Sequence, residues 1–143
     1  MITFKAYKGT GFISKLIMLF SNGKFSHISI IIDGLMYEAS MNKGVIMSLY
    51  TGDGGYETET REVKITDKNK AEVVKFLESQ IGKKYDYRGI YAFLMPLAKP
   101  KMGSWYCSEL AMVSLGKALG KPDIYEEQLV SPQEFWNILE LIV

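Results

Sequence analysis

The dipeptide Asp33-Gly34 stands between two runs of strand-forming residues, and it constrains the fold of this chain more than any other feature. The segment Phe25–Asp33 is rich in β-branched residues, and Leu35–Ser40 follows the dipeptide at once. An Asp-Gly pair between apolar runs is a strong signal for a two-residue β-hairpin. The residues that flank such a turn, 32 and 35, pair with each other, so the numbers of all paired residues add to 67.

This register gives the only histidine of the chain, His27, a neighbour on the second strand. Side chains alternate between the two faces of a strand, so His27, Ser29 and Glu38 share one face. Glu38 lies diagonally across from His27, roughly 7–8 Å away between backbones and within side-chain reach. A carboxylate there would fix the tautomer of the ring and raise its proton affinity. The alternative is an ordinary strand histidine that simply hydrogen-bonds a neighbouring Glu or Ser.

The only cysteine, Cys107, opens a predicted helix over Cys107–Leu119. The first amides of a helix have no internal partners and carry the positive end of its dipole, which favours a thiolate and can stabilise an oxyanion. Glu109 in the same turn would somewhat oppose thiolate formation. A free cysteine is also often just a buried apolar residue. With one cysteine and one histidine, an internal disulfide is excluded and the usual zinc site would need two carboxylates as well.

The rest of the chain predicts strands in its first half and helices in its second. Further strands are predicted over Ile2–Lys8, Gly44–Tyr50 and Glu57–Ile65, with a glycine-rich loop at Thr51–Tyr56. One helix is predicted from an Asp67 cap to Gly82, with Ala71, Val74, Leu77 and Ile81 as its apolar positions. A short helix is predicted near Arg88–Leu94. A last helix is predicted over Pro132–Leu141, after a Ser131/Glu134 capping box. This order predicts one α+β domain, residues 1–143, with a mostly antiparallel sheet.

Composition excludes several classes of function. The 17 basic and 16 acidic residues give a net charge of +1, which offers no footprint for nucleic acid, although Tyr85, Tyr87, Arg88, Tyr91, Lys99 and Lys101 form an aromatic and basic stretch. The apolar run Gly11–Phe20 is shorter than the about 20 residues that span a bilayer, so we expect a core or amphipathic helix, with peripheral membrane contact left open. The N-terminus lacks a signal-peptide pattern, so we expect a cytoplasmic protein.

Several blocks of the sequence, taken in order, resemble the circularly permuted branch of the NlpC/P60 papain-like superfamily, and its YiiX/YaeF-like group more than the lecithin retinol acyltransferase-like one. The blocks are Ser26–Ile30, Tyr37-Glu38-Ala39, Gly44-Val45, Ile81–Asp86 and Trp105–Leu110. The histidine strand here precedes the cysteine helix, which is the permuted order. Glu38 stands where the acyltransferase-like relatives tend to have a second histidine. Such proteins occur in bacteria and phages, so either origin fits.

The resemblance implies a papain-like fold and a set of roles. Cys107 would be the nucleophile, His27 the general base and Glu38 the third polar residue. Tyr85, Trp105 and Tyr106 would line the substrate site, with Met95–Gly103 as an additional wall. No metal or cofactor is expected. The implied activity is a cysteine hydrolase that cleaves an amide or ester through an acyl-enzyme, with bacterial cell-wall peptides as the first substrate class. The alternatives are a lipid acyl hydrolase or acyltransferase, and a non-catalytic binding or inhibitory module on the same fold.

Overall fold

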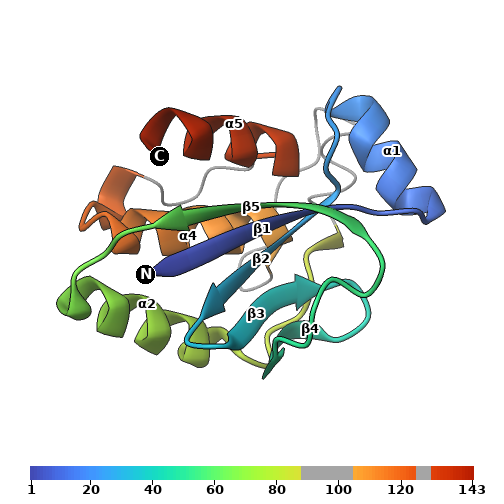
Figure 1. Ribbon diagram of the computed structural model, residues 1–143. Coiled ribbons are helices and arrows are strands. Elements are labelled where there is room, and N and C mark those ends of the chain that lie inside the picture. Colours follow the sequence, from blue (N-terminus) through green and yellow to red (C-terminus); the bar gives the residue numbers. More distant parts are fainter. Residues whose placement is uncertain (88–104, 125–129) are drawn as a thin grey trace.

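The computed structural model describes residues 1–87, 105–124 and 130–143, which form an α+β arrangement of one sheet and several helices (Figure 1). The strands are β1 (Ile2–Lys8), β2 (His27–Ile32), β3 (Leu35–Ser40), β4 (Gly44–Leu49) and β5 (Glu57–Val63). The helices are α1 (Phe12–Phe20), α2 (Asp67–Gln80), α4 (Cys107–Ala118), the 3₁₀ turn η1 (Pro122–Ile124) and α5 (Pro132–Ile142).

The five strands form one antiparallel sheet in the order β4-β3-β2-β1-β5. The predicted hairpin between β2 and β3 is confirmed. Asp33 and Gly34 both have positive φ, 50° and 80°, as a type I′ turn requires. Ile32 pairs with Leu35, and the two pairs beyond them keep the same sum of 67.

The two faces of the sheet differ in character. Along β1 and β2, alternate apolar side chains are buried in the core: Ile2, Phe4, Ala6, Ile28, Ile30 and Ile32. Helix α4 packs against β2 and β3, and α2 and α5 pack against α4, so nearly every side chain of α4 is buried. The opposite face carries His27 and the polar residues of the same strands. The core therefore fixes which way the histidine points.

Helix α2 corrects part of the sequence interpretation. Its N-cap is Thr66, whose hydroxyl accepts a hydrogen bond from the Asn69 amide at 3.1 Å, and Asp67 is the first helical residue. The buried positions are Val73, Leu77 and Gln80, whereas Ala71 and Ile81 are exposed. A weakly apolar helix does not identify its inner face by pattern alone. Here a polar residue is buried because the Gln80 amide oxygen accepts a hydrogen bond from the Trp105 indole at 2.9 Å.

The last helix agrees with its predicted start. The Ser131 hydroxyl accepts a hydrogen bond from the Glu134 amide, and the Glu134 carboxylate accepts one from the Ser131 amide. The predicted helix near Arg88–Leu94 and the loop Met95–Gly103 lie outside the described residues. None of the helices in the described ranges is long and apolar enough to cross a membrane.

Candidate active site

His27 and Glu38 form a close pair on the face of the sheet opposite the core. His27 is the first residue of β2 and Glu38 lies within β3. Their side chains meet with the ring Nε2 2.6 Å from Oε2 of the carboxylate. Both side chains are mostly covered, with 27% and 20% of their surface exposed. The contact that the hairpin register predicted is therefore present.

Cys107 interacts with the same histidine. The thiol stands at the first residue of α4, is 1% exposed, and lies close enough to the His27 side chain to raise its pKa. Cysteine, histidine and carboxylate thus form a continuous chain of polar contacts, although 107 − 27 = 80 residues separate the first two.

The two partners favour the charged form of the imidazole. Burial acts on the pKa of His27 in the downward direction, but the hydrogen bonds and the attraction from Cys107 and Glu38 raise that pKa from 6.5 to about 10. The hydrogen bond from His27 lowers the pKa of Glu38, against an opposing effect of burial. The site therefore stabilises an imidazolium between two acceptors at neutral pH.

Glu109, the acidic residue in the first turn of α4, has a structural role of its own. The Glu109 carboxylate accepts a hydrogen bond from the Tyr106 amide at 3.1 Å and so caps the helix. Burial raises the pKa of Glu109 to about 7, with the Tyr106 amide opposing that rise. At neutral pH this carboxyl is only partly ionised, which reduces its expected opposition to a thiolate on Cys107. The N–H of Cys107 belongs to the same turn, where amides have no carbonyl partner within the helix.

Of the three aromatic residues predicted to line the substrate site, two lie beside the thiol. The rings of Tyr85 and Tyr106 are 5.8 Å apart and both are buried. Burial raises the pKa of each phenol, and a negative charge on Cys107 raises both further. Trp105 turns away toward α2, where its ring packs edge-on against Phe76 at 5.6 Å.

A short backbone bridge holds this aromatic group in place. Trp105 and Tyr85 form a parallel bridge, in which the Trp105 amide donates to the Lys84 carbonyl and the Asp86 amide donates to the Trp105 carbonyl. The neighbouring segment is tied to β4, because the Val45 amide donates to the Lys83 carbonyl at 2.8 Å. The bridge thus connects the sheet to the residue two positions before the thiol.

Sequence reasoning missed one residue that supports the histidine, Tyr7. The Tyr7 ring lies 5.7 Å from the His27 ring, and the Ser29 hydroxyl donates to the Tyr7 hydroxyl at 3.2 Å. Tyr7 pairs directly with His27 across β1 and β2. The signal that could have found Tyr7 is the pairing of β1 with β2, since the strand pattern of Ile2–Lys8 already places Lys5 and Tyr7 on one face.

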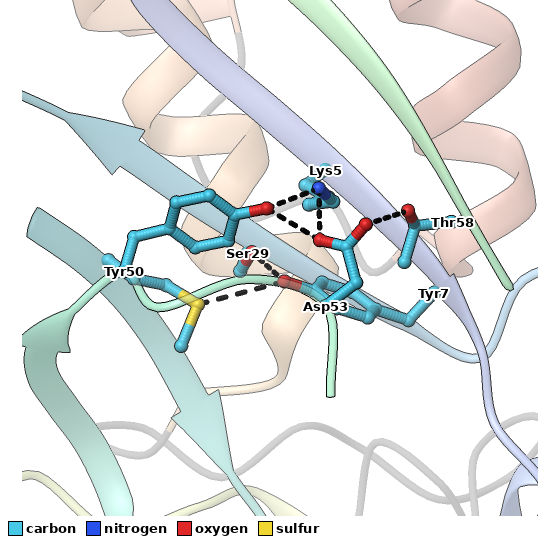
Figure 2. A network of polar contacts seen from close by, with 7 residues as sticks. Lys5, Tyr7, Ser29, Tyr50, Asp53 and Thr58 are labelled. Carbon is cyan, nitrogen blue, oxygen red and sulfur yellow. Dashed lines mark hydrogen bonds and ion pairs between the residues drawn. The ribbon is translucent and has the colours of Figure 1, made fainter. Parts of the chain in front are cut away.

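A second polar cluster, also missed, fixes the glycine-rich loop above this face (Figure 2). Lys5, only 6% exposed, forms an ion pair with Asp53 and donates to the Tyr50 hydroxyl at 2.7 Å. Asp53 also accepts hydrogen bonds from Tyr50 at 2.5 Å and from Thr58 at 2.9 Å. Tyr56 from this loop packs edge-on against Tyr7, 6.4 Å away. The glycine-rich loop therefore contacts Tyr7, which in turn packs against His27.

No group of three or more His, Cys, Asp and Glu side chains within the described residues is arranged to hold a metal ion. No protein-family model matches the chain, and no curated protein matches it at a significant level of similarity.

Proposed function

We propose that the protein is a cysteine hydrolase that cleaves an amide or ester bond through an acyl-enzyme, with Cys107 as nucleophile, His27 as acid and base, and Glu38 as the residue that orients His27. One observation carries the proposal: a single imidazole interacts with a buried thiol at a helix start and, through Nε2 at 2.6 Å, with a carboxylate. This is the arrangement that activates a thiol nucleophile.

The proposed reaction proceeds in two steps. In the reacting form, His27 already holds the proton of Cys107 as an imidazolium, and the thiolate sulfur bonds to the substrate carbonyl carbon while the charge moves to the carbonyl oxygen. The N–H of Cys107 stabilises that oxyanion, and Tyr85 is a candidate second donor. His27 then gives its proton to the leaving amine or alcohol as the carbon–heteroatom bond breaks. Water, deprotonated by His27, attacks the thioester and releases the acid and the thiol.

For the fold, we propose a papain-like domain in the permuted NlpC/P60 order. Support comes from the order of the elements, in which the histidine strand β2 precedes the cysteine helix α4. We take peptide amides, including bacterial cell-wall peptides, as the first substrate class, and lipid esters as the alternative. Release of an amine from labelled peptides, compared with release of fatty acid from micelles, separates the two classes.

A non-catalytic binding module is the second candidate, and the burial of the thiol favours it. With 1% exposure, Cys107 offers a carbonyl little access until neighbouring groups move. The two candidates differ in how readily the thiol reacts with a small reagent. A catalytic thiol is activated by its histidine, whereas a buried structural thiol is inert.

Alkylation by iodoacetamide at pH 6–7 tests the proposal on the only cysteine of the chain. We expect the folded protein to react faster than the same chain unfolded in urea, and His27→Ala to lower the folded rate by at least about tenfold. Cys107→Ala, which has no site to alkylate, is the background control. The same variant should fold normally and lose all turnover of a cleaved substrate. A folded rate below the unfolded one, unchanged in His27→Ala, contradicts the proposal and leaves the binding module.

A further inference from the structure

Helix α1 exposes its apolar face, the reverse of what an amphipathic helix in a globular protein normally does. Ile17 is its only buried residue, whereas Phe12 is 77% exposed and Leu19 is 72% exposed. At 100° per residue, the exposed apolar side chains occupy one continuous arc of about 120°. They are Phe12, Ile13, Leu19 and Phe20, with the half-buried Leu16 between them. We call this arc the α1 apolar face.

Contacts at both ends hold α1 in this orientation. Before the helix, the Gly9 amide donates to the Ser26 hydroxyl at 3.0 Å. After it, the Lys24 amide donates to the Gln133 side-chain oxygen at 2.7 Å, which ties the chain to the start of α5. Figure 1 shows α1 at one end of the molecule, standing away from the sheet. These contacts therefore hold α1 with its apolar face exposed to solvent.

The charged residues of α1 and of the turn that follows it are lysines. Residues 9–32 contain two lysines and no aspartate or glutamate, whereas Lys5 and Lys8 of β1 are paired with Asp53 and Glu57. Lys15 lies on the flank of the α1 apolar face and Lys24 follows the helix by four residues, and both are exposed. A helix with an apolar stripe and basic residues beside it is typical of a segment that lies in the surface of an anionic bilayer.

We propose that α1 is a membrane-surface docking site, with its apolar face inserted at the boundary of headgroups and acyl chains and its lysines against anionic lipid. Nine residues give a helix about 13 Å long, which suits contact in the plane of the surface. A second copy of the chain is the less favourable occupant, because a two-fold contact between identical α1 faces would bring lysine against lysine. The proposal is independent of the chemistry of Cys107.

Co-sedimentation of the full chain with sucrose-loaded vesicles tests the docking site. We expect binding to vesicles of phosphatidylcholine with phosphatidylglycerol, weak binding to phosphatidylcholine alone, and loss of binding as salt is raised. Lys15→Gln and Lys24→Gln should each weaken binding about fivefold. Phe12→Ser combined with Leu19→Ser should weaken it by at least about tenfold, since both side chains would leave water on binding.

Matched controls separate this result from other causes. Leu141 in α5 is 89% exposed, so Leu141→Ser removes an equally accessible apolar side chain elsewhere and should bind as the unaltered chain does. Cys107→Ala should also bind normally, whatever its effect on hydrolysis. The proposal is overturned if the chain does not sediment with anionic vesicles, or if Leu141→Ser weakens binding as much as the α1 variants do. A dimer in sedimentation velocity that Leu19→Ser dissolves would overturn it in favour of self-association.

Discussion

The protonation of His27 can be measured directly, because its ring is the only imidazole in the chain. Its C–H signals in a proton NMR spectrum need no assignment by mutation. The structure predicts that this ring stays positively charged well above pH 8, since its pKa is raised to about 10 by Cys107 and Glu38 against the effect of burial. An exposed histidine would instead lose its proton near pH 6.5.

The size of the effect follows from the two partners. A pKa of about 10 lies 10 − 6.5, or roughly 3.5, above the ordinary value of the ring. At 1.36 kcal/mol for each pH unit, the site prefers the charged ring by about 5 kcal/mol. Glu38 is one of the two groups that raise the pKa of His27, after Cys107. A hydrogen bond to a charged group is worth about 1.5–3 kcal/mol, so Glu38→Gln should lower the pKa of His27 by roughly 1–2.

The assay is a titration from pH 5 to pH 11 of the unaltered chain, Glu38→Gln, Cys107→Ala and the double variant. Each single variant should lower the pKa of His27, and the double variant should bring it to 6.5 or below, because burial then acts alone. Glu62→Gln, a carboxylate of the same sheet without contact to His27, is the control and should leave the titration unchanged. A ring that loses its proton between pH 6 and 7 in the unaltered chain would refute the reasoning.

Three further predictions concern stability. The hydrogen bonds from Lys5, Tyr50 and Thr58 lower the pKa of Asp53 from 3.8 to about 2. The ion pair of Asp53 with Lys5 therefore stabilises the fold above pH 4, and this stabilisation is lost as the pH falls toward 2. In thermal unfolding, Asp53→Asn should show a lower Tm at pH 7 and a smaller change in Tm between pH 4 and 2. Gly44 has φ +72°, and a Cβ there would lie 2.2 Å from the Lys83 carbonyl oxygen, so Gly44→Ala should lower the Tm while an unchanged Tm would contradict the contact. Ser131→Ala removes the N-cap of α5 and should cost about 1 kcal/mol in urea unfolding, with a loss below about 0.3 kcal/mol counting against the cap.

The local part of the site could be predicted from the sequence, because the turn type fixes the register. Asp33-Gly34 selects a type I′ turn, and the turn then determines which residues of β2 and β3 share a face. The contact between His27 and Glu38 follows without any knowledge of the rest of the fold. The position of Cys107 at a helix start was predictable for a similar reason, since the pattern that begins a helix is local.

The non-local part could not be predicted in this way. The meeting of α4 with β2 depends on how a helix packs across a sheet, and no local pattern encodes it. The pairing of β1 with β2, which brings Tyr7 to His27, is equally distant in sequence. The buried Lys5 shows the same limit. A lysine in an alternating strand is expected to be exposed to solvent, and its burial is explained only by the ion pair with Asp53, which lies in a distant loop.

The long separation between the thiol and its histidine has a consequence for folding. The hairpin of β2 and β3 can form early from neighbouring residues, whereas α4 must dock onto it across 80 residues of chain before the thiol gains its partner. Helix content alone therefore carries no information about that event. The reactivity of Cys107 reports on it. A pulse of alkylating reagent during refolding would therefore show when α4 docks onto the hairpin of β2 and β3, with no added probe.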